Sequence, residues 1–159
     1  MTAKKNRPEL SLRQRALNLV SRRDYSRVEL ARRLATYCED SDEISAVLSD
    51  FEQRGWLSDA RFAEQVLHQR QGSMGTRRIT QELREKGLDA ATIEAALEAN
   101  PVDELDVARS VWLKKFGTPP TTQQEKAKQV RFLQSRGFGL NSIFKVIGGS
   151  PDDDVVEEY

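Results

Sequence analysis

The chain has 159 residues, enough for one domain or a short row of small units, and its 25 Lys and Arg balance its 25 Asp and Glu. The single cysteine, Cys38, excludes an internal disulfide, and no apolar run approaches the ~20 residues of a spanning helix. We therefore expect a cytoplasmic protein without signal peptide or membrane span. Bases nevertheless gather in residues 1–38 and 101–150, so the fold can offer basic faces to an anionic partner.

Periodic apolar positions predict an all-α fold, and the sequence shows neither strand alternation nor hairpin turns. Nine helices are expected, at residues 10–22, 27–38, 42–54, 59–71, 76–86, 90–99, 102–116, 122–136 and 140–148.

Several of these helices are expected to begin at a side chain that caps free backbone N–H groups. Ser26 with Glu29 and Thr122 with Glu125 have the spacing of a capping box, and Asp40 with Glu43 imitates it. Further N-caps are expected at Ser58, Thr76, Asp89 and Asn141.

Three helices are predicted to end in the same way, with a base, a glycine and a bulky apolar residue. The segments are Arg54-Gly55-Trp56, Lys86-Gly87-Leu88 and Arg136-Gly137-Phe138. A glycine with φ > 0 stops a helix, and the apolar residue after it packs on one four residues before the glycine. The base suits the negative end of the helix. We therefore expect φ > 0 at all three glycines.

These turns and the intervening breaks divide the chain into three tandem three-helix repeats, at residues 10–57, 58–100 and 101–149. Short units of this kind bury their apolar faces on their neighbours, so we expect an elongated and curved array. Residues 1–9 are expected to be a flexible N-terminal extension, and residues 150–159 an acidic disordered tail.

The search for catalytic chemistry in the sequence is mostly negative. There is no glycine-rich loop ending in Gly-Lys-Ser/Thr, so no phosphate cradle of that type is expected. His68 lacks partners at ligand spacing and is expected at the surface, and Cys38 is expected to be a small core residue. We predict no catalytic residue, no cofactor and no metal.

Bases on three predicted helices are the stronger functional signal. On residues 76–86, Ile79 and Leu83 mark the inner face and polar side chains occupy the opposite face. A solvated helix face is the alternative to a binding role. The candidate partner-binding residues are Arg77, Arg78, Gln81 and Arg84 on this helix, Arg27, Arg32 and Arg33 on residues 27–38, and Lys126, Lys128 and Arg131 on residues 122–136.

Four segments in this order resemble the RecX family. They are YSRVELARRL (25–34), GWLSDARFA (55–63), GTRRITQELREKGL (75–88) and FLQSRGF (132–138), and the resemblance extends from about residue 12 to 148. It implies tandem three-helix repeats, no cofactor and a regulator of the RecA recombinase rather than an enzyme. Such a regulator binds the RecA filament on DNA, blocks its extension and inhibits strand exchange, ATPase and coprotease activities in DNA repair and the SOS response.

Two other functions stay open at this level. A DNA-binding helical-repeat protein could act directly on single- or double-stranded DNA, because three-helix units can present a helix to a groove. The zero net charge and the acidic tail count against this as the main role. A small hydrolase is the other alternative. We expect a monomer, with direct DNA contact as an additional option.

Overall fold

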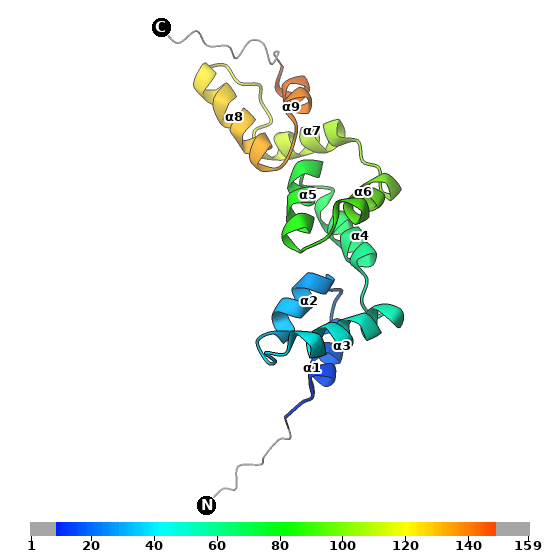
Figure 1. The fold of residues 1–159 in the computed structure, drawn as a ribbon. Helices are drawn as coiled ribbons and strands as arrows, with labels where there is room; N and C mark the ends of the chain where they lie inside the picture. The colour runs from blue at the N-terminus through cyan, green and yellow to red at the C-terminus, as the bar shows by residue number, and fades with distance from the viewer. Residues whose placement is uncertain (1–8, 149–159) are drawn as a thin grey trace, which may run out of the picture. The chain divides into compact units, whose positions relative to one another are not determined.

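The computed structural model describes residues 9–148 and has the predicted all-α fold (Figure 1). Within this range there is no strand, and the helices are α1 (Leu12–Val20), α2 (Arg27–Leu34), α3 (Ser41–Gln53), α4 (Asp59–Arg70), α5 (Thr76–Glu85), α6 (Ala90–Ala99), α7 (Glu104–Lys115), α8 (Gln123–Ser135) and α9 (Leu140–Ile147). Each overlaps one of the nine predicted helices. The predicted extension, except Glu9, and the predicted tail lie outside the described residues.

The end of α2 is the one boundary that departs clearly from the prediction. The helix stops at Leu34 instead of residue 38. After it, the amide of Thr36 donates to the carbonyl of Arg33 and that of Tyr37 to Leu34, a tighter i to i+3 pattern. The prediction extended this helix because Leu34, Ala35 and Cys38 continue the apolar face begun by Val28 and Ala31.

The chain forms two compact units. Unit 1 contains the described residues up to Phe62 together with Lys86–Leu88, and unit 2 contains Ala63–Glu85 and the described residues from Asp89 onward. The three predicted repeat ranges and the elongated, curved shape stay predictions.

Each unit has its own apolar core. In unit 1, Ala16, Leu30, Leu34 and Phe51 are fully buried where α1, α2 and α3 meet. In unit 2, a second cluster from α7, α8 and α9 surrounds Leu133 and Ile143, both fully buried. Trp112 belongs to this cluster, and its indole Nε1 donates to Gln129 Oε1 at 2.8 Å, so the buried polar pair is satisfied.

Most of the predicted N-caps are confirmed. Ser26, Thr122, Asp40, Asp89 and Ser58 all accept a hydrogen bond from a backbone N–H in the first turn of the helix that follows. The predictions of N-caps at Thr76 and Asn141 were wrong, because both residues lie inside their helices. The N-cap of α9 is Gly139, which has no side chain to accept a hydrogen bond.

The three predicted glycine turns are confirmed, with φ of +75° at Gly55, +84° at Gly87 and +90° at Gly137. After α3, Gly55 N donates to Glu52 O at 3.1 Å and Trp56 N to Phe51 O at 2.9 Å. The Phe51 and Trp56 rings meet edge to face with centroids 5.4 Å apart. This is the paired hydrogen-bond pattern and apolar contact that a glycine helix stop produces.

Candidate partner-binding surface

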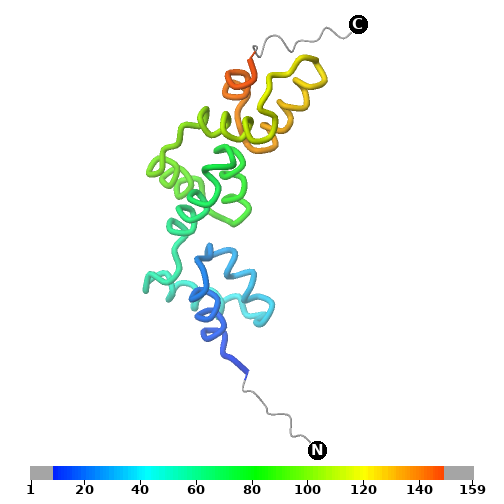
Figure 2. The backbone as a smooth tube through the Cα atoms, turned by 180° about the vertical axis from the view of Figure 1, so that it is seen from behind, coloured from blue at the N-terminus to red at the C-terminus, as the bar shows by residue number. Residues whose placement is uncertain are grey.

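Two backbone segments of unit 2 meet in a joint that positions the first turn of α5. The segments are Gly75–Arg78 and Arg136–Gly139, and we call their contact the α5–α8 joint (Figure 2). Gly75 N donates to Arg136 O at 2.7 Å. A Cβ on Gly75 would lie 2.3 Å from Gly137 O, and one on Gly137 would lie 2.5 Å from Arg78 N. Only glycine at both positions lets the two backbones approach so closely.

The polar face of α5 carries three arginines that the fold does not neutralise. Arg77, Arg78 and Arg84 are exposed, with Gln81 between them, and none of the three arginines forms an ion pair with any of residues 9–148. The opposite face, with Ile79 and Leu83, is buried as predicted.

The position of Arg77 and Arg78 is electrostatically unfavourable in the isolated fold. Both lie in the first turn of α5, which holds no acidic residue. The N-terminus of a helix carries a partial positive charge, so cations there are repelled and an anion is attracted. This end of α5 is therefore suited to an anionic partner.

A basic cleft of about 250 Å³ lies beside the joint. Its lining is Gly72, Ser73, Val111, Lys114, Lys115, Phe132 and Arg136, with no acid among them. The Phe132 ring lies under two of the bases, with its centroid 5.5 Å from Lys115 Nζ and 5.2 Å from Arg136 Cζ. Lys114, Lys115 and Arg136 were not among the sequence candidates; the Lys pair at the end of a predicted helix was the available signal.

The candidate bases of α2 lie in unit 1 and differ in their surroundings. Arg27 is half-buried, and its guanidinium pairs with Glu52 and donates to Ser45 and Ser49 of α3. It therefore serves the packing of α2 on α3. Arg32 and Arg33 are exposed, and Arg33 has no ion pair within the described residues.

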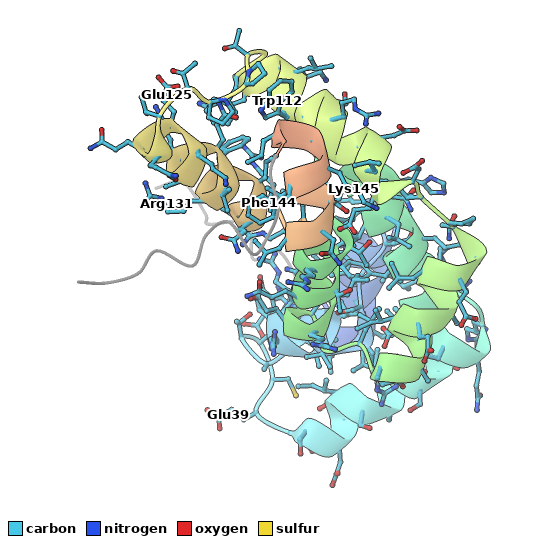
Figure 3. The ribbon with its side chains drawn as sticks, turned by 90° about the horizontal axis from the view of Figure 1, so that it is seen from above. Glu39, Trp112, Glu125, Arg131, Phe144 and Lys145 are labelled. Atoms are coloured by element: carbon cyan, nitrogen blue, oxygen red, sulfur yellow. The ribbon has the colours of Figure 1, made fainter. Side chains whose placement is uncertain are left out.

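The candidate bases of α8 do not form one face. Lys126 Nζ lies 5.3 Å from the ring centroid of Phe144, a residue of α9 on the side toward α8 (Figure 3). Lys128 is exposed and lines a separate cleft of about 260 Å³ with Glu125 and Gln129. Arg131 is exposed and extends outward from α8.

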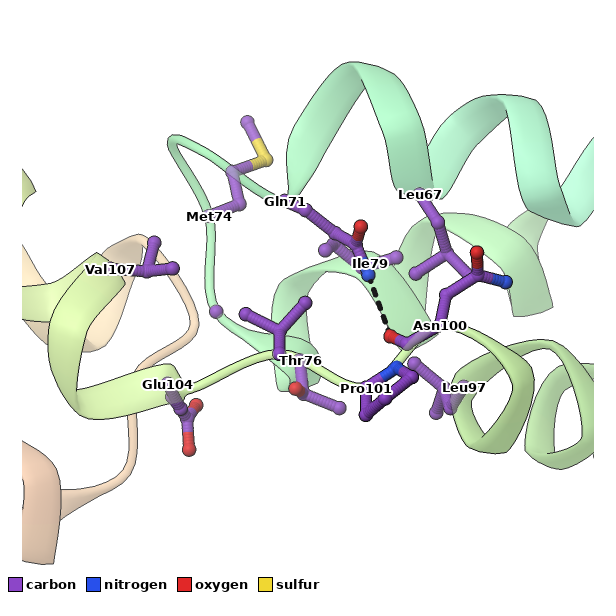
Figure 4. A pocket seen from close by; sticks show the side chains of 12 residues that line it. Leu67, Gln71, Met74, Thr76, Ile79, Leu97, Asn100, Pro101, Glu104 and Val107 are labelled. Carbon is purple, nitrogen blue, oxygen red and sulfur yellow. Dashed lines mark hydrogen bonds between the residues drawn. The ribbon is translucent and has the colours of Figure 1, made fainter.

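A third cleft, of about 240 Å³, is mainly apolar and lies within unit 2 between α4, α5, α6 and the start of α7 (Figure 4). Gln71 Nε2 donates to Asn100 O at 3.0 Å across it. Glu104 is the one ionisable side chain in its lining. The cleft therefore holds no pair of groups for acid–base chemistry.

Neither His68 nor Cys38 lies in a cluster of groups that could bind a metal or activate a nucleophile. His68 is exposed, as predicted. Cys38, predicted in the core, is only half-buried against the unit 1 core, and its Sγ lies 3.4 Å from Glu43 Oε2. No group of three or more His, Cys, Asp or Glu that could hold a metal occurs among residues 9–148. No helix in that range is long and apolar enough to cross a membrane.

Comparison with known proteins assigns the family. Residues 13–51, 58–97 and 102–147 match the family models of the first, second and third three-helix domains of RecX, in that order. The chain belongs to the RecX family. Among its relatives are the proteins named regulatory protein RecX of Chromobacterium violaceum, 45% identical, and of Leptothrix cholodnii, 46% identical. The matches cover 93% of this chain and 96% of the first relative, and 89% and 90% for the second.

A solved RecX structure has the same fold. The crystal structure of RecX from Lactobacillus salivarius superposes with a TM-score of 0.72 over 86% of this chain and 92% of that one, at 20% identity. The resemblance stated from the sequence is thus confirmed for family and for the three-helix architecture. As a RecX family member, the chain is a regulatory protein and not an enzyme.

Proposed function

We propose that this chain is a negative regulator of RecA that binds the RecA filament on DNA and blocks its extension. The observation that carries the proposal is the ordered match to all three RecX three-helix domains. On this proposal, strand exchange, ATP hydrolysis and coprotease activity of RecA fall when the filament stops growing. The chain acts in the cytoplasm, where the filament forms, and as a monomer.

The polar face of α5 is the proposed main contact. Its three unpaired arginines and its positively polarised N-terminus favour an anion, either acidic protein surface or DNA phosphate. Arg32 and Arg33 on α2, and Lys128 and Arg131 on α8, are secondary candidates because they too are exposed. Arg27 contributes through the packing of unit 1.

The test changes Arg77 and Arg78 together to Ala. The dose of protein that halves RecA ATPase on single-stranded DNA should rise by at least tenfold and become less sensitive to salt. Losing one partner of a buried interfacial charge pair costs roughly 2–5 kcal/mol, whereas an exposed ion pair is worth only ~0–1 kcal/mol of stability. Thermal melting should therefore barely change.

The matched control changes Arg54 and Arg109 to Ala, which removes the same charge from exposed arginines that pair with Asp50 and Asp106. This control should inhibit RecA like the parent. Equal inhibition by the Arg77/Arg78 variant would instead move the contact to α2 or α8.

Direct action on DNA is the alternative, favoured by the same unpaired arginines. Affinity for naked single- and double-stranded DNA should be measured between 50 and 300 mM NaCl without RecA. Tight binding with a steep salt slope would support this alternative. Weak binding together with potent inhibition of RecA would support the filament contact.

A further inference from the structure

We propose that the acidic segment Asp152–Tyr159 of this chain binds the basic cleft of unit 2, the cleft formed by Lys114, Lys115 and Arg136 around Phe132. The segment lies outside the described residues, and its sequence is DDDVVEEY. The proposal concerns an intramolecular contact and does not depend on binding to RecA.

The first argument is charge complementarity. The cleft is lined by three bases and no acid, and none of the three bases forms an ion pair within residues 9–148. The segment contains five acids, Asp152, Asp153, Asp154, Glu157 and Glu158, and no base. Opposite charges brought together on one molecule attract even at physiological salt, where screening acts over about 8 Å.

The second argument is the mixed chemistry of the cleft. Val111 and Phe132 are only half-buried and form an apolar part of the lining, beside the bases. The segment likewise combines its acids with Val155, Val156 and Tyr159. An acidic stretch with apolar side chains can place carboxylates on the bases and bury aliphatic surface against Phe132, and removing that surface from water favours the contact.

The third argument is reach. Val111 and Phe132 of the cleft pack against the same core as Ile147, at the end of α9. Helix α7 has 12 residues and is therefore ~18 Å long, which sets the scale of this helical group. Residues 149–159 can extend over roughly 36–40 Å. The part of the segment nearest Tyr159 can therefore reach the cleft, and the short tether keeps its effective concentration near the millimolar range.

The consequence follows from the position of Arg136. Its carbonyl accepts the Gly75 amide, and the adjacent Gly137 packs on Arg78, so the cleft adjoins the face of α5 that we propose for RecA. An anionic segment in the cleft competes with an anionic partner of that face. The bound segment thereby lowers the affinity of the free protein for an anionic partner.

The test uses the full chain with its five segment acids neutralised: Asp152→Asn, Asp153→Asn, Asp154→Asn, Glu157→Gln and Glu158→Gln. Relative to the parent, amide NMR signals of residues 111–115, 132 and 136 should shift. A synthetic peptide of residues 150–159 added to the neutralised chain should move them back toward the parental positions. Raising NaCl from 50 to 500 mM should weaken peptide binding at least tenfold.

Variants of the cleft and of α5 locate the binding site. In the neutralised chain, Lys114→Ala with Lys115→Ala should weaken peptide binding at least tenfold, and adding Arg136→Ala should weaken it further. The matched control, Arg77→Ala with Arg78→Ala, removes the same charge from α5 and should change affinity less than twofold. Since both cleft lysines are exposed, these variants should melt like the parent.

Three outcomes would overturn the proposal: identical signals in the parent and the neutralised chain, equal loss of peptide binding in the cleft and α5 variants, or equal binding of a peptide with the same residues in scrambled order. The last two would reduce the contact to net charge. Because the assay contains neither RecA nor DNA, its failure leaves the proposed function standing.

Discussion

The turns after α3 and α8 share one backbone design but lie in different surroundings. Gly55 and Gly137 both have φ > 0, and both are followed by an aromatic residue that packs back on the helix. A Cβ on Gly55 would meet nothing within 4 Å. A Cβ on Gly137 would lie 2.4 Å from Arg78 Cβ and 2.5 Å from Arg78 N. Gly55 is thus required for its backbone conformation alone, whereas Gly137 is required for its conformation and because a side chain would collide with Arg78.

Gly87 resembles Gly137 in this respect. A Cβ there would lie 2.3 Å from Val28 Cγ2, a contact within unit 1. Gly87 and Gly137 follow α5 and α8, the middle helices of the second and third matched domains, whereas Gly55 follows the last helix of the first. The surroundings of this shared turn therefore depend on its place in the repeat. The turns after the middle helices α5 and α8 pack on a neighbouring segment, and at the turn after α3 no atom lies close to the glycine.

Gly137→Ala should have the largest effect. Its φ strain costs about 1–2 kcal/mol and forcing a methyl group against backbone about 1–3 kcal/mol, so unfolding free energy should fall by about 2–5 kcal/mol. Urea denaturation measures this. The variant should also lose inhibition of RecA, because the first turn of α5 must move. A loss of only 1 kcal/mol would make this turn equivalent to that of Gly55.

Gly87→Ala should be nearly as costly, at about 2–4 kcal/mol, because Val28 is β-branched and cannot easily rotate away. A double-mutant cycle with Val28→Ala measures the part of the collision that comes from the two Cγ atoms of Val28, because the Val28 Cβ, 2.5 Å away, stays in place. The glycine substitution should cost about 1 kcal/mol less when Val28 is already Ala. Strict additivity of the two changes would show that the docked contact does not contribute.

Gly55→Ala should cost only about 1 kcal/mol, from backbone conformation alone. Gly55→Asn should cost less, since Asn tolerates this conformation better than Ala. Both are measured by the same denaturation experiment. A loss of unfolding free energy as large as that of Gly137→Ala would contradict the open surroundings of Gly55.

The smallest effect concerns the ion pairs beside the Gly87 turn. Burial raises the pKa of Glu29, but hydrogen bonds from Arg23 and Lys86 outweigh it and hold that pKa below its ordinary value. A lowered folded-state pKa stabilises the fold above the unfolded pKa, and this part is lost as pH falls through the folded value. Glu29→Gln should therefore destabilise the protein at pH 7, and the deficit should shrink below pH 4. A deficit independent of pH between 7 and 3 would contradict this assignment.

Local chemistry was sufficient to predict most of the fold. The helix positions, five of the seven predicted caps and the three positive φ values depend on residues within one or two turns of each other. Thr76 was predicted as a cap because its hydroxyl has the right chemistry, but it is the first residue of α5, and Gly75 before it lies against Gly137.

The candidate surface was predictable only in part. The exposed face of α5 followed from its apolar period. The pairing of Arg27 with Glu52, and the meeting of Lys114, Lys115 and Arg136 around Phe132, depend on segments distant in sequence. No local sequence pattern predicts such contacts, so a base that forms an ion pair within the fold cannot be told in the sequence from one that does not.

The hydrogen bond between Gly75 N and Arg136 O has a further consequence for the dynamics of unit 2. This amide belongs to a buried residue that precedes α5, and it donates to the turn between α8 and α9. It can exchange its proton with solvent when that turn lifts from α5, without unfolding of either helix. The exchange rate of one amide in heavy water thus reports the free energy of opening the contact between α5 and the α8–α9 turn. Comparing that rate with those of amides inside α5 and α8 separates opening of this contact from melting of the helices themselves.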